Sequence, residues 1–187
     1  MNRSPKRRIG HLFRRPATLA RDERGATAVE FGLLAIPFFG IVMAILETSL
    51  IFLSGQVLES AVNDASRAIR TGQVQQTNQT IDDFRANICN RLYGLFRDCS
   101  GLHIRVVELG GFESISFVTP VDWNCETDCD WTEDETWSPG VGKSVVLVQV
   151  HYKFPVMLQV GSLGMANLPN NLRLMGTATV FQNEPFT

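Results

Sequence analysis

The chain has 187 residues, a formal net charge of −2 and 44% hydrophobic residues, so it has room for one membrane segment and one modest globular domain but not for several large domains. The near-neutral average hides an asymmetry: residues 1–24 carry eight basic and two acidic side chains, a net charge of +6, which leaves −8 for the remainder. Two segments that differ this much in charge are expected to lie in different environments, with residues 1–25 forming a basic cytoplasmic leader.

A long apolar segment follows the basic leader. No charged residue occurs from Phe31 to Leu46, and the chain stays apolar after Glu47 up to Leu53. A helix over Ala26–Leu53 would be about 42 Å long, enough to cross a hydrocarbon core of about 30 Å. Its apolar residues lie on all sides, which favours lipid over the core of a soluble domain. We therefore predict one transmembrane helix over residues 26–54.

The orientation of this helix follows from the distribution of charge. All the basic residues of the leader precede the span, so the N-terminus is expected in the cytoplasm and the C-terminal domain outside it. A secretory signal peptide is the alternative. Its apolar region would be about 7–15 residues long and would end in a small-residue cleavage site. The apolar run here is longer, and Leu53–Val57 is a poor site of that kind.

Two carboxylates interrupt the apolar segment. A carboxylate at the centre of a membrane helix costs about 2.5–3.5 kcal/mol, so Glu30 is expected to have a partner or to rest at the level of the lipid headgroups. Glu47 comes 17 residues later and lies on another face of the helix. It either sits at the outer membrane interface or contacts a partner subunit within the membrane, and the sequence leaves both open.

The rest of the chain predicts an α+β domain. An apolar stripe from Val57 to Ile69 extends the membrane helix, Gln73–Gln79 forms a linker, and these make up segment 55–79. Thr80 is the expected N-cap of a helix from Ile81 to about Phe96. The strand candidates are His103–Leu109, Glu113–Val118, Ser144–Phe154 and Leu172–Phe181. A helix packed on an antiparallel sheet is therefore expected over residues 80–187.

These segments together resemble a known family. The stretch Arg24-Gly25-Ala26-Thr27-Ala28-Val29-Glu30-Phe31 resembles the processing site of a type IVb prepilin, in which glycine is followed by four residues and then Glu-Phe. Joined to Pro37, to Ile45-Leu46-Glu47 and to the ending Ala178–Phe186, it is similar to the TadE-like proteins. These are minor pilins or pseudopilins of the tight-adherence (Flp) pilus. The resemblance implies a pilin-like fold with a long N-terminal helix.

The resemblance also implies a site and partners. A prepilin peptidase would cleave between Gly25 and Ala26, and Phe31 belongs to its recognition pattern. Glu30 would then be the fifth residue of the mature chain and would neutralise the N-terminal ammonium of a neighbouring subunit. Two charges that are each costly in lipid become tolerable as a pair. The implied partners are the peptidase, other pilins, the assembly platform and membrane lipid, with the chain anchored in the inner (cytoplasmic) membrane.

Four cysteines lie in the predicted outer domain, where oxidation is expected. Three pairings are possible. Short separation, together with the resemblance around the first pair, favours Cys89–Cys99 and Cys125–Cys129. A metal site built on the second pair is the alternative, because Asp122, Glu126, Asp128 and Asp130 surround it. Structural zinc more often uses two-residue spacing, so disulfides are preferred and no metal is expected.

No motif in the chain predicts an enzyme or a cofactor. Residues 139–144 resemble part of a phosphate-binding loop, but Trp137 occupies the position of its first glycine and a strand follows where a helix is required. The histidines have no metal spacing. The leader arginines come without a nucleic-acid-binding fold, so they fit membrane topology better than a nucleic-acid partner. A membrane-anchored periplasmic binding or adhesion module, without filament assembly, remains the alternative function.

Overall fold

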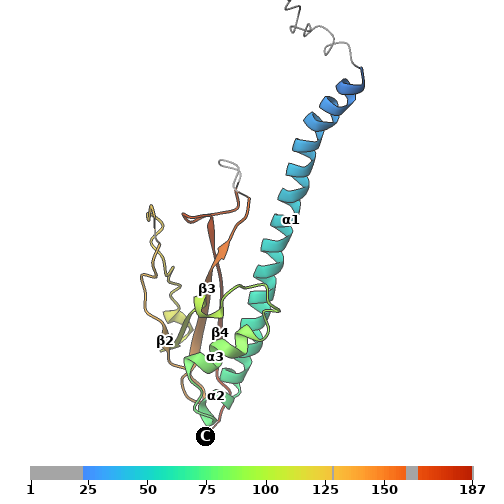
Figure 1. Cartoon of the computed structure of the whole chain (residues 1–187). Helices are drawn as coiled ribbons and strands as arrows, with labels where there is room; N and C mark the ends of the chain where they lie inside the picture. The colour runs from blue at the N-terminus through green and yellow to red at the C-terminus, as the bar shows by residue number, and fades with distance from the viewer. Residues whose placement is uncertain (1–22, 128, 159–163, 187) are drawn as a thin grey trace, which may run out of the picture. The chain divides into compact units, whose positions relative to one another are not determined.

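The computed structural model describes residues 23–127, 129–158 and 164–186. The helices in chain order are α1 (Glu23–Arg70), α2 (Gln73–Gln76) and α3 (Ile81–Cys89), followed by the short 3-10 helices η2 (Cys99–Gly101) and η3 (Phe112–Ser114). The strands are β1 (His103–Leu109), β2 (Thr136–Trp137), β3 (Val145–Pro155) and β4 (Leu172–Gln182) (Figure 1). The chain divides into two compact units, Met1–Met43 and Ala44–Thr187.

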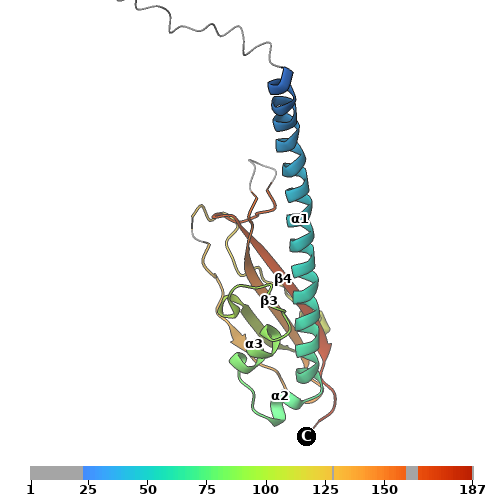
Figure 2. The same ribbon diagram turned by 45° about the vertical axis from the view of Figure 1, so that its right-hand side comes forward.

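Helix α1 joins the predicted span and the predicted apolar stripe into one element of 48 residues. Its residues after Ile51 repeat at three- and four-residue spacing on one buried face, which is the pattern of an amphipathic helix packed on a core. These buried residues are Leu58, Ala61, Val62, Ala65 and Ile69. In Figures 1 and 2 this part of α1 runs beside β4. The prediction of a continuous helix is confirmed.

Helix α3 begins where it was predicted but ends earlier. The Thr80 N–H donates to the Asp83 carboxylate at 2.8 Å, and the Asp83 N–H donates to the Thr80 hydroxyl at 3.3 Å, which forms a capping box. The helix stops at Cys89, and Tyr93 and Gly94 adopt positive φ angles that no α-helix can contain. Leu92 is nevertheless buried. The apolar spacing thus identified core residues correctly, although turns carry the later ones.

The predicted linker after α1 also contains structure. Gly72, with φ of 79°, starts α2, whose Val74 is buried. A side chain at Gly72 would meet the Phe186 ring, and the Glu184 N–H donates to the Arg70 carbonyl at 2.8 Å. Both contacts join the end of α1 to the residues after β4. This gives a packing role to the C-terminal ending that resembled the family.

The sheet has the strand order β2-β1-β3-β4. β1 and β4 both pair antiparallel with β3, as predicted, whereas β2 pairs parallel with β1 and makes the sheet mixed. The expected strand at Glu113–Val118 is absent, and η3 occupies its start. β2 was not predicted because two residues carry no periodicity. Its Trp137 is held by Phe84, at 5.2 Å between ring centroids, and by the Gln79 carbonyl, which accepts from the indole at 3.1 Å.

One face of the sheet forms the core with the helices. Alternate residues of β3 point into it and are nearly inaccessible to solvent: Val146, Val148, Val150, Tyr152 and Phe154. The ring of Phe96 packs on Tyr152 and Phe154, with centroid distances of 4.8 and 5.7 Å. The period-2 alternation of β3 thus sets the core, and its other residues occupy a second face.

Candidate functional site

The residues of the predicted processing site lie in the first turns of α1. Gly25, Ala26, Glu30 and Phe31 are all exposed, and Phe31 keeps 71% of its surface accessible. A side chain added at Gly25 would meet no atom within 4 Å. The first turn of a helix lacks intrahelical acceptors for its N–H groups and frays easily. The Gly25–Ala26 bond therefore lies in an accessible segment that can extend.

The apolar surface of α1 continues far beyond this site. Large hydrophobic side chains remain more than half exposed along the helix, including Phe31, Leu34, Phe38, Ile41, Ile45, Phe52 and Leu53. A soluble monomer rarely exposes such a continuous apolar surface, so another phase or another protein must cover it. Among the described residues, α1 is the one helix long and apolar enough to cross a membrane.

Glu30 stands alone on this apolar surface. Within the described part of the chain its carboxylate has no hydrogen bond and no ion pair, and its neighbour Phe31 is exposed. An unpaired carboxylate of this kind can accept a proton, a hydrogen bond or a cation from another molecule. The cleavage site and the Glu30 contact stay predictions, because they concern other molecules.

Glu47 differs from Glu30 because its own chain supplies partners. Its carboxylate accepts the backbone N–H of Leu158 at 2.9 and 3.1 Å and also the N–H of Met157. The neighbouring hydroxyls of Thr48 and Ser49 each donate to a backbone carbonyl four residues earlier, at 2.8 Å. Every polar side chain of this turn thus has a partner. A contact between Glu47 and a partner subunit stays a prediction.

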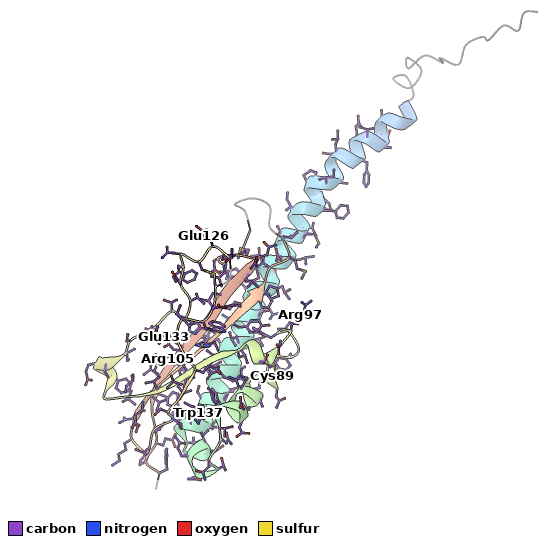
Figure 3. All side chains as sticks on the ribbon, turned by 60° about the vertical axis from the view of Figure 1, so that its left-hand side comes forward. Cys89, Arg97, Arg105, Glu126, Glu133 and Trp137 are labelled. Atoms are coloured by element: carbon purple, nitrogen blue, oxygen red, sulfur yellow. A yellow bond between two sulfur atoms is a disulfide. The ribbon has the colours of Figure 1, made fainter. Side chains whose placement is uncertain are left out.

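The cysteines form the two disulfides that were predicted, Cys89–Cys99 and Cys125–Cys129. The first joins the end of α3 to η2, with its Cα atoms 5.8 Å apart, and the second closes a short turn with Cα atoms 5.4 Å apart. Figure 3 shows Glu126, within that turn, at the opposite end of the sheet from Trp137. The pairing uses the sulfur atoms that the alternative metal site would have needed.

A cluster on the second face of the sheet was not predicted. His103 and His151 are paired across β1 and β3, and the Trp131 ring stacks on His103 with centroids 4.4 Å apart. Lys153 lies 4.2 Å from the centre of the Trp131 ring and donates to the Cys129 carbonyl. These contacts fix the acidic loop on the sheet. The sequence offered only the polar alternation of Gln149, His151 and Lys153, without the register that brings Trp131 to them.

Burial shapes the titration of this cluster. Burial, followed by the charge of His103, lowers the pKa of His151 from 6.5 to about 4. Burial also lowers the pKa of His103, although Glu135 opposes the shift. Gly176 lies opposite His151 on β4, and a side chain there would come within 2.5 Å of the imidazole. Both histidines are therefore neutral packing residues near pH 7, held in a space that a glycine leaves open.

The fold and the exposed helix define a class of protein. One helix, long and apolar enough to cross a membrane, continues directly into an α+β domain with two disulfides. Residues 25–67 match the family model described as TadE-like protein, which confirms the predicted resemblance over that segment. This is a pilus-associated, pilin-type structural family and not a family of enzymes. No curated protein and no solved structure matches the chain.

Proposed function

We propose that this chain is a minor pilin or pseudopilin of a tight-adherence (Flp, type IVb) pilus. Helix α1 anchors it in the cytoplasmic membrane, with the basic leader inside and the α+β domain outside. The observation that carries the proposal is the match over residues 25–67, which covers the Gly25–Ala26 bond, Glu30 and the whole exposed apolar surface of α1. A pilus-associated family implies contacts with other pilus components, and an exposed helix of this kind has the surface for them.

Processing by a prepilin peptidase uses the start of α1. The basic leader is attracted to anionic headgroups by about 1 kcal/mol per basic side chain near the surface, which keeps the site at the cytoplasmic face. Gly25 leaves the scissile carbonyl unshielded, because glycine has no side chain and, apart from its own helix turn, no atom lies within 4 Å of the Cβ position. The first turn then opens and presents the Gly25–Ala26 bond in extended form.

Cleavage creates the partner that Glu30 lacks. The new N-terminus at Ala26 carries an ammonium group, and Glu30 lies four residues, or about 6 Å, further along the helix. In the assembled state this ammonium pairs with the Glu30 carboxylate of a neighbouring subunit, and the apolar surfaces of the two helices pack together. Pairing removes most of the cost of placing either charge in lipid.

Two experiments on native membranes test the processing and the pairing. Mass spectrometry of the N-terminus should find a mature chain that begins at Ala26. Glu30→Ala should abolish association with other pilins and pilus production. Glu59→Ala is the matched control, because Glu59 is an exposed carboxylate on α1 beyond the apolar segment. A chain that still begins at Met1 beside an active peptidase would refute processing, and normal pili from Glu30→Ala would refute the pairing.

Exchanging the transmembrane helix distinguishes the proposed pilin from the alternative function, a membrane-tethered binding or adhesion module. Replacing residues 26–53 with an unrelated transmembrane helix of equal length keeps the anchor but removes Glu30 and the helix surface. A tether would keep its binding function after this exchange. A pilin should lose assembly, which co-purification with other pilus proteins measures.

A further inference from the structure

The end of β3 presents an apolar surface at one end of the sheet. Val156 is buried, whereas Pro155 and Met157 are exposed, and Met157 keeps 76% of its surface accessible. The sequence between Phe154 and Arg173 contains no charged residue. A connection between two strands is usually polar, because it lies in water. This connection carries no charge, and the exposed residues at its start, Pro155 and Met157, are apolar.

Glu47 positions this segment on α1. The N–H groups of Met157 and Leu158 converge on its carboxylate, and Leu158 bonds both oxygens at 2.9 and 3.1 Å. A carboxylate that accepts several N–H groups is stabilised without a cation. The same bonds satisfy two backbone donors that would otherwise need water. Glu47 therefore holds the exposed Met157 beside α1, and neither its carboxylate nor the two backbone N–H groups needs a water molecule as partner.

The position of Glu47 along α1 decides what surrounds Met157. Phe52 and Leu53 are 65% and 52% exposed, and they lie five and six residues nearer the domain than Glu47. At 1.5 Å per residue, the exposed apolar surface of α1 extends about 8 Å beyond the level of Glu47. Any bilayer that covers Phe52 and Leu53 must therefore reach the level at which Met157 is attached.

We propose that Pro155 and Met157 form a second, shallow membrane contact, at the boundary of headgroups and acyl chains in the bilayer that holds α1. The inference rests on the proposed insertion of α1. Amphipathic elements bind this boundary through buried apolar area. Arg173 lies opposite Phe154 on β4, and its guanidinium donates to the Met165 carbonyl at 2.7 Å. The acidic Cys125–Cys129 turn, bonded through the Thr127 carbonyl to Asn170 at 3.0 Å, lies near the same strand ends. The contact is therefore apolar and does not require anionic lipid.

Site-directed spin labelling of the full chain in phosphatidylcholine vesicles tests the contact. All four native cysteines are paired, so Met157→Cys introduces the one free thiol for a nitroxide. Val141→Cys is the aqueous control, because Val141 is also exposed (67%) and precedes the opposite end of β3. Phe39→Cys reports on the span itself. We expect the ratio of collisions with oxygen to collisions with a water-soluble nickel chelate to be several-fold higher at 157 than at 141, and highest at 39.

The outcomes separate this inference from the proposed function. A ratio at 157 equal to that at 141, with 39 in lipid, overturns the membrane contact alone. An aqueous ratio at 39 means that α1 is not inserted, and then the proposed function fails as well. A high ratio at 157 that disappears when the protein is diluted in lipid identifies a second copy as the occupant, which also overturns the inference. Adding Glu47→Ala should mobilise the label at 157 and lower its ratio; an unchanged spectrum would refute the role of Glu47.

Discussion

Both parts of α1 contain large apolar side chains, but the parts differ in what covers these side chains. Leu34 and Ile41 are 70% and 63% exposed, whereas Leu58 and Val62 are 1% and 0% exposed. In the first part apolar residues occur on every side, and in the second they occupy one stripe that faces the sheet. The comparison shows that a helix with one apolar stripe and a polar remainder is covered by its own chain. A helix that is apolar on all sides must obtain its cover from lipid or from other subunits.

The largest effect should separate two equal truncations in these two parts. Leu58→Ala leaves a cavity in the core and should lower the free energy of unfolding of the domain by about 2–5 kcal/mol. Leu34→Ala removes the same atoms from an exposed position and should leave that free energy unchanged. Denaturant unfolding of both variants in mild detergent, followed by tryptophan fluorescence, makes the measurement. Equal destabilisation would mean that both parts of α1 belong to one core.

The disulfides give a second test of the difference between the exposed part of α1 and the domain, because both disulfides lie in the domain. Replacing Cys89 and Cys99 by serine reopens a loop with a sequence separation of 10, which should cost about 3 kcal/mol of domain stability through the entropy of the unfolded chain. Replacing Cys125 and Cys129, with a separation of 4, should cost about 2 kcal/mol. The helicity of residues 26–53 should not change in either variant. Chemical unfolding followed by circular dichroism measures both quantities. If the helix over residues 26–53 lost structure together with the domain, this prediction would be wrong.

Acid should weaken the domain by a smaller amount. His151 has a pKa of about 4 in the fold and about 6.5 when unfolded, so the unfolded chain binds more protons between these values. The contribution of His151 to stability should therefore be nearly constant well above pH 6.5 and should fall as the pH drops through 6.5 towards 4. The contribution of His151 to this slope should stay below about 1.4 kcal/mol per pH unit, because a single group takes up at most one proton.

The lowered pKa of His103 acts in the same direction as that of His151. Asp83 and Asp98 have pKa values held below 3.8 by hydrogen bonds from Thr80 and Ser100, so they contribute at lower pH. The His151→Asn variant isolates the contribution of His151 and should flatten the dependence between pH 6.5 and 4. Unfolding curves at pH 7, 5.5 and 4.5 make the comparison. An unaltered slope in the variant would assign the effect to other groups.

The sequence predictions that were confirmed rest on patterns among residues that are close together in the chain. The apolar run and the stripe after it predicted one continuous helix, Thr80 predicted a helix start, and the long β-branched run over Ser144–Phe154 predicted β3. Each signal lies within one element, so neighbouring residues suffice to identify it. The end of α3 was misplaced because Leu92 continues the apolar spacing while Tyr93 and Gly94 turn the chain. The strand over Glu113–Val118 was wrong, because a weak alternation without a paired partner does not form a strand.

The sequence alone determined the long helix, the positions of its two carboxylates and the chain's resemblance to a family, since these depend on composition, spacing and local propensity. Tertiary structure alone decided which distant groups meet: Met157 and Leu158 at Glu47, Trp131 on His103, and β2 beside β1. Such contacts depend on strand register and on loop closure over many residues. No local pattern encodes them, and so two glutamates that look alike in one apolar run differ, the first lacking a partner among the described residues and the second satisfied by its own chain.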